Sequence, residues 1–222
     1  MKTMTKLYIV RHPQAMGNAQ RIFQGYYNAE VSEMGEKQLE ALAERFKNIQ
    51  FDVIYTSPLL RAVKTAKAVN KYHNAEIIEY KGIIEINGGD IEAKPWSHFE
   101  ETYPEKYKQW KNEPHNFVAP NGESMLEVFN RAKASLEDIL KQNEGKTVVL
   151  TSHGCTIRNM FCVLKGLNIE NLNDVNWVEN TGVTLVEIEN NRVEFIFEND
   201  LEHLPEEIRP IKRNTKEYYC RK

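Results

Sequence analysis

Short apolar runs alternate with helical patterns along this chain, and that alternation restricts the possible folds more than any other feature. The strand-type runs lie at 7–10, 53–55, 76–80 and 147–151. Segments whose apolar residues recur every three or four positions follow them, at about 34–46, 57–69, 96–111, 124–142 and 155–166. Alternating strands and helices form βαβ units, which build a mostly parallel sheet with helices on both faces. We therefore expect an α/β fold, a three-layer sandwich.

Local signals refine this arrangement at two helix starts and at one edge of the sheet. Ser32 is placed to cap the first helix, and Ser57-Pro58 has the pattern of an N-cap followed by the first residue of the second. The sequence also predicts an antiparallel hairpin at the sheet edge, formed by strands at 183–188 and 192–197 and a turn at Asn190-Asn191.

No repeat, low-complexity stretch or linker interrupts the 222 residues, so we expect a single domain over 1–222. The segment at about 86–122 differs from the rest, because it is rich in aromatic and acidic residues and contains four prolines. We interpret it as a lid inserted into the main domain. The end of the chain, at about 206–222, is polar and basic, and we interpret it as a solvated tail.

The charge balance argues against polyanionic partners. Lys and Arg number 29 and Asp and Glu 32, which leaves a formal charge of −3. A chain without a net positive field does not attract nucleic acid, so we expect no nucleic-acid partner. The longest apolar run, Met160–Leu164, is far shorter than the ~20 residues of a membrane span, so we expect no membrane partner.

Cysteine usage and the amino terminus indicate a cytoplasmic protein. The three cysteines, Cys155, Cys162 and Cys220, are odd in number and lack metal-ligand spacing, as is usual in a reducing compartment. Residues 1–5 are polar, and no apolar segment of the signal-peptide type follows them. We expect Cys155 to be a small buried residue in the first turn of a helix.

Charged side chains follow four of the predicted strands, close to the point where each ends. Arg11-His12 follows the first strand, Arg61 lies one turn into the helix after the second, Glu85 comes shortly after the third, and His153 follows the fourth. Because ligands of parallel sheets bind beyond the carboxyl ends of the strands, we expect these side chains to meet at one edge. Each alone would be an ordinary surface residue, and their coincidence indicates a site.

Two arginines, two histidines and a carboxylate are suited to phosphoryl transfer. The arginine fork matches phosphoryl oxygens, and a histidine held between two arginines can attack phosphorus to form a phosphoenzyme. The other histidine, if protonated, adds a third cationic donor. Glu85 can protonate the leaving oxygen and later accept a proton from the attacking water. Because such transfer depends on positioning and charge, we expect neither a metal nor a cofactor.

Four segments, in this order along the chain, form a specific set of signatures. They are 7–12 with Asn18 and 23–25, then 55–62, then 85–96, and finally 152–158. Two further segments, 120–124 and 180–183, belong to the same pattern. Over about residues 6–205 the chain resembles the histidine phosphatase superfamily, which contains the cofactor-dependent phosphoglycerate mutases.

The resemblance implies a role for each of these residues. It implies that His12 is the phosphorylated nucleophile and that Glu85 is the proton donor. It also implies that the phosphate pocket consists of Arg11, Arg61 and His153, and that further phosphate or substrate contacts come from Asn18, Gln24, Gly25 and Gly154.

The chain departs from the family pattern beside the nucleophile and in the third signature. Pro13 stands where a glycine usually follows the nucleophile, which removes one backbone N–H and favours extended geometry at His12. No catalytic side chain is deleted, so we expect activity to survive. Gly88 and Ile91 replace common aromatic residues and Ala93 a common glycine, changes that bear on substrate preference.

The lid composition favours a hydrolase over a mutase. Family mutases hold the phosphoglycerate carboxylate with paired lid arginines, whereas this chain has no arginine between Glu85 and Gly122. We expect a phosphomonoester hydrolase that acts on a small phosphorylated metabolite, with a cofactor-dependent phosphoglycerate mutase as the alternative. A non-catalytic phospho-ligand binder is less favoured, because His12 and Glu85 are both present. The natural substrate and the oligomeric state, a homodimer included, are left open.

Overall fold

The computed structural model describes residues 4–190 and 192–210, and at the centre of these residues lies a six-stranded sheet. The strands are β1 (Thr5–Arg11), β2 (Val53–Thr56), β3 (Glu76–Glu79), β4 (Thr147–Ser152), β5 (Val183–Glu189) and β6 (Arg192–Asp200). Their order across the sheet is β3-β2-β4-β1-β5-β6. The first four strands run parallel, whereas β5 is antiparallel to β1 and β6 to β5. The predicted fold class is confirmed.

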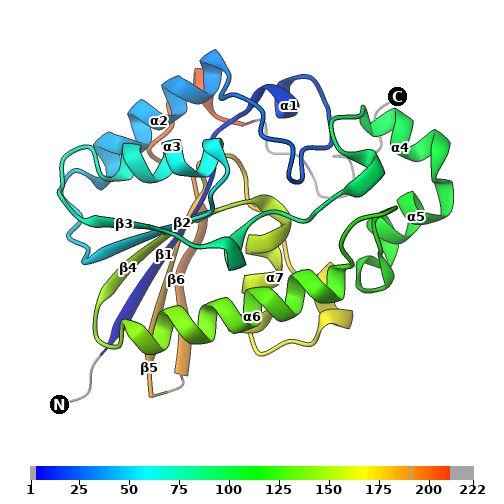
Figure 1. Cartoon of the computed structure of the whole chain (residues 1–222). Coiled ribbons are helices and arrows are strands. Elements are labelled where there is room, and N and C mark those ends of the chain that lie inside the picture. Colours follow the sequence, from blue (N-terminus) through cyan, green and yellow to red (C-terminus); the bar gives the residue numbers. More distant parts are fainter. Residues whose placement is uncertain (1–3, 191, 211–222) are drawn as a thin grey trace.

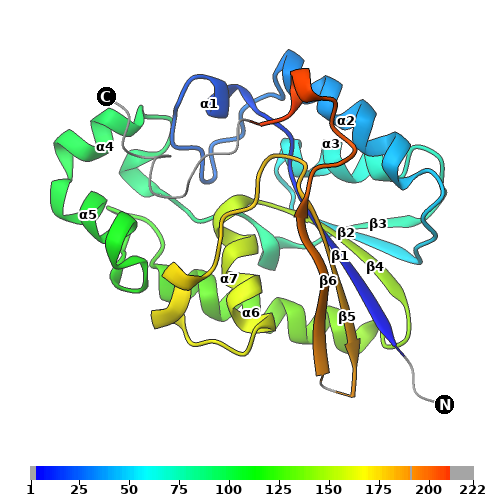
Figure 2. The ribbon, with the colours of Figure 1, turned by 180° about the vertical axis from the view of Figure 1, so that it is seen from behind.

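Helices cover both faces of the sheet. The described α-helices are α1 (Met16–Ala19), α2 (Glu33–Phe46), α3 (Leu60–Val69), α4 (Trp96–Thr102), α5 (Pro104–Asn112), α6 (Met125–Gln142) and α7 (Gly154–Leu164). Figure 1 shows α2 and α3 on one face and α6 and α7 on the other, and Figure 2 shows the same layers from behind. In both views α4 and α5 lie to one side of these layers.

Successive residues of β1 enter two different cores, because side chains along a strand point alternately to opposite faces. Leu7 and Ile9 belong to the larger apolar cluster, which includes residues of α6 and α7. Val10 belongs to the second cluster, together with Leu42 and Phe46 of α2. Burying a side chain such as Phe46 contributes about 1.5–3 kcal/mol, so both helix layers are held to the sheet by the hydrophobic effect.

One of the two predicted helix caps is correct and the other is wrong. Ser32 accepts a hydrogen bond from the first turn of α2, as predicted. Ser57 does not cap α3, which begins at Leu60. The N–H of Leu60 donates instead to Asn28 Oδ1 (2.8 Å), and Ser57 Oγ is engaged by His153. A cap supplied from a distant loop has therefore replaced the local one.

The helix predicted over 96–111 is divided into α4 and α5. Tyr103 separates them with φ −132° and ψ 59°, outside the helical region, and Pro104 is the first residue of α5. Proline lacks the N–H that would continue a helix and disfavours helical geometry at the preceding residue. The apolar spacing alone did not indicate this break.

The predicted edge hairpin is present as β5 and β6, and Asn190 adopts the left-handed φ of 51° that its turn requires. Asn191, Cys220 and most of the predicted basic tail (211–222) lie outside the described residues.

Cys155 is buried in the first turn of α7, as expected. Among the described helices, none is both long and apolar enough to cross a membrane.

Strand register brings the predicted site residues to one edge of the sheet. Arg11, the last residue of β1, is paired with Ser152, the last residue of β4. On the other side of β4, Thr56 of β2 is paired with Thr151. The segments that follow β1, β2 and β4 therefore leave the sheet side by side.

Candidate active site

A cavity of about 400 Å³ gathers most of the predicted site residues. Eight of the nine line it: Arg11, His12, Asn18, Gln24, Gly25, Arg61, Glu85 and Gly154. The ninth, His153, is not part of the lining and lies against His12, with the two ring centroids 5.2 Å apart. Residues far apart in sequence thus meet at the carboxyl edge of the sheet.

His12 is held as a neutral, nucleophilic imidazole. It is 3% exposed, and its Nδ1 lies 2.7 Å from the carbonyl oxygen of Pro13. A carbonyl only accepts hydrogen bonds, so we assign the ring proton to Nδ1 and the free lone pair to Nε2. Burial lowers the pKa of His12 well below its usual value, and the charges of Arg61 and Arg11 lower it further.

The backbone around His12 is fixed from both sides. Its N–H donates to the carbonyl of Ser152 (3.0 Å), and its carbonyl accepts from Asn180 Nδ2 (3.0 Å). Pro13 lacks an N–H but keeps the carbonyl that orients the ring. The departure at this position therefore leaves the orientation of His12 intact.

His153 supports its neighbours as a neutral ring. Arg61 Nε donates to its Nδ1 (3.2 Å), so its other nitrogen, Nε2, carries the proton that is donated to Ser57 Oγ (2.6 Å). Burial lowers its pKa well below the usual value, and Arg61 adds to that effect. The expectation of a third cationic donor is not met in this structure, because both ring nitrogens are engaged as in a neutral imidazole.

Two arginines supply positive charge to the cavity. Arg61 is 1% exposed, and burial lowers its pKa to about 10, so it is still cationic at neutral pH. Arg11 Nη1 donates to the carbonyl of Val178, whereas its buried Nε has no partner among the described residues. Gly154 allows the close approach of Arg11, since a Cβ there would lie 3.3 Å from Arg11 Cζ. An unpartnered cationic N–H in a cavity is a ready donor to an anion.

Glu85 is anchored to the first turn of α7. Its Oε1 accepts from the N–H of Ile86 (3.0 Å) and from the N–H and Oγ1 of Thr156 (both 3.2 Å). Its Oε2 accepts from the N–H of Cys155 (3.1 Å). The carboxylate therefore has a fixed orientation at the cavity wall, with lone pairs on Oε2 still available for proton transfer.

Sequence reasoning missed Arg131, which holds the backbone that carries Glu85. Its guanidinium donates to the carbonyls of Gly82 (3.1 Å), Ile84 (2.6 Å) and Glu85 (3.1 Å). It is paired with Glu123 at 2.6 Å, and both side chains are mostly buried. A signal was available, because position 131 lies three residues after Val128 and four before Ser135, both buried on α6, and a charged residue at that spacing is unusual.

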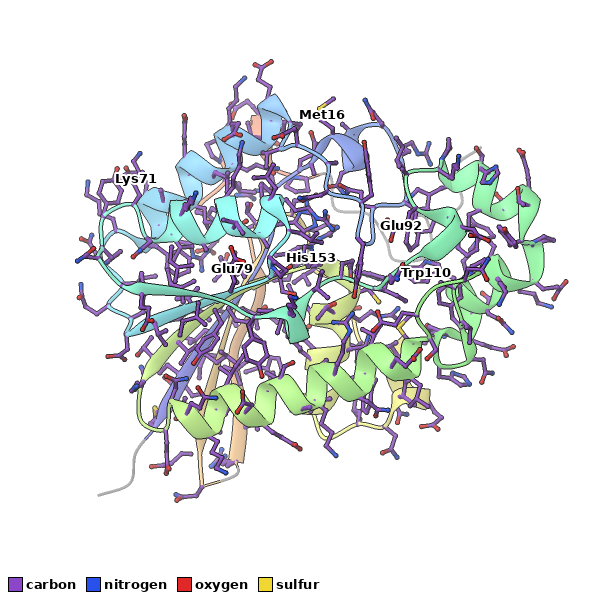
Figure 3. All side chains as sticks on the ribbon, viewed as in Figure 1. Met16, Lys71, Glu79, Glu92, Trp110 and His153 are labelled. Atoms are coloured by element: carbon purple, nitrogen blue, oxygen red, sulfur yellow. The ribbon has the colours of Figure 1, made fainter. Side chains whose placement is uncertain are left out.

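Aromatic rings from α4 and α5 form the far wall of the cavity. Trp96, Tyr107 and Trp110 line it together with Phe23, and the Phe23 ring lies 5.0 Å from Trp96 and 5.5 Å from Trp110. Phe99 is fully buried in the core instead. Figure 3 shows Trp110 reaching inward from this segment, whereas His153 comes from the end of β4.

Other polar groups of the cavity come from the segment before α2. Asn18 Oδ1 accepts from the N–H of Ala15 (2.9 Å), which leaves its amide nitrogen for a ligand. Gln24 Oε1 is buried and has no partner among the described residues. Arg21, which sequence reasoning did not single out, also lines the cavity. Within the part of the chain that the structure describes, no group of three His, Cys, Asp or Glu residues could hold a metal ion.

Comparison with known sequences identifies relatives that are phosphatases by name and relatives that are probable mutases by name. The family model of the histidine phosphatase superfamily (branch 1) matches residues 7–201. Phosphoserine phosphatase 1 of Hydrogenobacter thermophilus is 37% identical over 166 residues, which cover 75% of this chain and 79% of that protein. A Yersinia enterocolitica protein described as "Probable phosphoglycerate mutase GpmB" is 30% identical over 168 residues, which cover 74% and 76%.

Solved structures agree with these sequence relationships. YhfR of Bacillus stearothermophilus superimposes with a TM-score of 0.85 at 27% identity, over 90% of this chain and 98% of that one. A mutant phosphoserine phosphatase of Entamoeba histolytica, solved with phosphoserine, superimposes with a TM-score of 0.79 at 27% identity, over 90% and 100%.

Proposed function

The chain belongs to the histidine phosphatase superfamily, and we propose that it is a phosphomonoester hydrolase that acts through a phosphohistidine at His12. The proposal rests on the state of His12, a buried neutral ring whose Nδ1 is hydrogen-bonded and whose Nε2 has no hydrogen-bond partner among the described residues. Such a ring is a nucleophile beside two arginines, the surroundings that a phosphoryl group requires.

The reaction proceeds in two balanced steps. In the first, Nε2 of His12 forms a bond to phosphorus, the bond to the ester oxygen breaks, and Glu85 gives that oxygen a proton. The alcohol leaves and the phosphoryl group stays on His12. In the second step a water molecule attacks phosphorus, Glu85 takes one of its protons, and the P–N bond breaks to release inorganic phosphate.

Arg11 and Arg61 stabilise the charge on the phosphoryl oxygens. Arg11 offers its unpartnered Nε–H, and Arg61 offers the N–H groups that its protein contacts leave free. Because Arg61 is buried and Arg11 is half-buried at the cavity, their attraction for a dianion is much stronger than at a solvated surface.

For the substrate we propose a small phosphorylated metabolite, with phosphoserine as the first candidate. Two similar proteins, from Hydrogenobacter thermophilus and Entamoeba histolytica, are phosphoserine phosphatases by name. Mutase activity is the second candidate, supported by the Yersinia relative.

We also propose that the segment at 86–122 acts as a lid on one domain, since α4 and α5 contribute cavity walls. A cytoplasmic location is supported by the two free cysteines, Cys155 and Cys162.

Hydrolysis of p-nitrophenyl phosphate is expected to continue in excess EDTA, within about twofold of the untreated rate. The proposed chemistry uses a histidine, arginines and a carboxylate, and no step requires a metal. Released p-nitrophenol is measured before and after dialysis against the chelator. Loss of activity that returns when a divalent cation is added back would contradict the mechanism.

The two candidate functions are separated by a substrate panel. Phosphoserine and 3-phosphoglycerate are supplied with and without 2,3-bisphosphoglycerate, and phosphate release and isomerisation are both measured. Phosphate release supports the hydrolase, whereas isomerisation without release would replace it with the mutase.

A further inference from the structure

The loop Gly25–Tyr27 lies between a buried cation, Arg61, and a half-buried anion, Glu92. Its carbonyls face Arg61, whose Nη2 donates to Gly25 O (2.8 Å) and whose Nη1 donates to Tyr27 O (2.9 Å). Its amides face Glu92, whose Oε1 accepts from Tyr26 N and whose Oε2 accepts from Tyr27 N, both at 2.7 Å. The loop is therefore hydrogen-bonded to opposite charges on its two sides.

One peptide group links the two charges directly. The unit between Gly25 and Tyr26 accepts from Arg61 with its oxygen and donates to Glu92 with its N–H. In such a chain each hydrogen bond polarises the next, so the cation and the anion reinforce each other's hold on the loop. Arg61 and Glu92 also attract each other electrostatically: burial lowers the pKa of Arg61 and raises the pKa of Glu92, and in each case the charge of the other group opposes that shift.

Close packing at Gly25 depends on the absence of a side chain. Its φ is +33°, and a Cβ there would lie 2.1 Å from Glu92 Oε1 and 2.6 Å from the carbonyl of Ile86. The same carboxylate oxygen accepts from the N–H of Gly88 (2.7 Å). Figure 3 shows Glu92 extending from the segment before α4 toward the interior. Glu92 is not part of the cavity lining, so it acts on the loop and not on the substrate.

The loop in turn fixes the orientation of the Arg61 guanidinium, and so the direction of the N–H groups that the protein does not use. A guanidinium has five N–H groups, and three of those of Arg61 are directed to His153, Tyr27 and Gly25. The two that remain are available to a phosphoryl group in the cavity that Arg61 lines. If the carbonyls of the loop move, the plane of the guanidinium moves with them.

We propose that Glu92 is a positioning residue, which sets the phosphate affinity of the site by holding the loop Gly25–Tyr27 against Arg61. The proposal rests on the proposed function only in that Arg61 receives the phosphoryl group. Glu92→Gln keeps the shape of the side chain but replaces one accepting oxygen with an NH₂ group, which would face an N–H donor. Glu92→Asp keeps both oxygens on a shorter stem.

Binding of inorganic phosphate to the full chain is measured by isothermal titration calorimetry, which does not require turnover. We expect Glu92→Gln to weaken binding about 10-fold, as for the loss of one charge-assisted hydrogen bond, and Glu92→Asp to recover part of it. With p-nitrophenyl phosphate, KM should rise by a similar factor while kcat stays within about threefold, because uniform binding is lost. Glu101→Gln, an exposed carboxylate on α4, serves as the matched control and should match the wild type.

Unchanged phosphate affinity in Glu92→Gln, or a fall in kcat at constant KM, overturns the proposal. If Glu92→Gln does not fold, Glu92→Asp decides, since an unchanged dissociation constant there with a lower Tm assigns Glu92 to stability alone. If wild-type protein binds phosphate but hydrolyses no ester, the proposed function fails while the calorimetric comparison still tests Glu92.

Discussion

Protein with His12→Ala is expected to lose phosphomonoester hydrolysis by at least about 10⁴-fold in kcat, because the atom that bonds to phosphorus has been removed. In the wild type, Nε2 of His12 is directed by the hydrogen bond of Nδ1 to Pro13 and is kept unprotonated by burial beside Arg61 and Arg11. Release of p-nitrophenol under saturating substrate measures the loss.

The loss must be separated from a loss of folding or of binding. His12→Ala should still bind inorganic phosphate, because Arg11 and Arg61 are unchanged, and its Tm should remain close to that of the wild type. His98→Ala, on α4 and outside the cavity lining, is the matched histidine control and should keep full activity. His12→Gln serves as the second variant if alanine destabilises the fold. Activity above about one tenth of wild type in a folded His12 variant would disprove nucleophilic catalysis by this residue.

Glu85→Gln is expected to have an effect that depends on the leaving group. An alkyl phosphate such as phosphoserine leaves as a basic alkoxide and needs the proton of Glu85, so its kcat/KM should fall about 10³-fold. p-Nitrophenolate leaves without protonation, so phosphorylation of His12 should be much less affected. The second step needs Glu85 as a base for both substrates, and p-nitrophenyl phosphate should therefore give a burst of p-nitrophenol followed by slow turnover.

Rapid-mixing absorbance with p-nitrophenyl phosphate measures the burst, and coupled phosphate detection measures phosphoserine. Glu101→Gln again provides a carboxylate control outside the cavity. Equal losses of kcat/KM for the two esters, without a burst, would show that Glu85 does not transfer the proton and that its role is to hold the first turn of α7 through Cys155 and Thr156.

The position of the site could be predicted from local sequence because it depends on strand ends. Each apolar run could be read by itself, and parallel pairing then places Arg11 beside Ser152 without further information. The apolar stripe of α2 and the cap at Ser32 are likewise local features. The break before Pro104 is also a local feature, because the proline interrupts a helix whose apolar spacing continues on both sides of it.

What could not be predicted depends on contacts between distant residues. Ser57 has the pattern of a helix cap, but its hydroxyl oxygen accepts a hydrogen bond from His153, which lies 96 residues away in the sequence. Glu92 lies within a recognised signature, yet its partners Tyr26 and Tyr27 are 66 and 65 residues distant. The neutral state of His153 follows from the Arg61 Nε–H that occupies its Nδ1, a geometry that residue types alone do not determine.

The central claim is that His12 carries the phosphoryl group, and trapping that intermediate tests it most directly. Glu85→Gln protein is mixed rapidly with p-nitrophenyl phosphate, quenched under alkaline conditions that preserve phosphohistidine, and analysed by intact-protein and peptide mass spectrometry. We expect one phosphoryl group per chain, located on His12, removed by mild acid, and absent from the same protein carrying His12→Ala as well. No covalent phosphate during turnover, or an acid-stable phosphate on another residue, would contradict it.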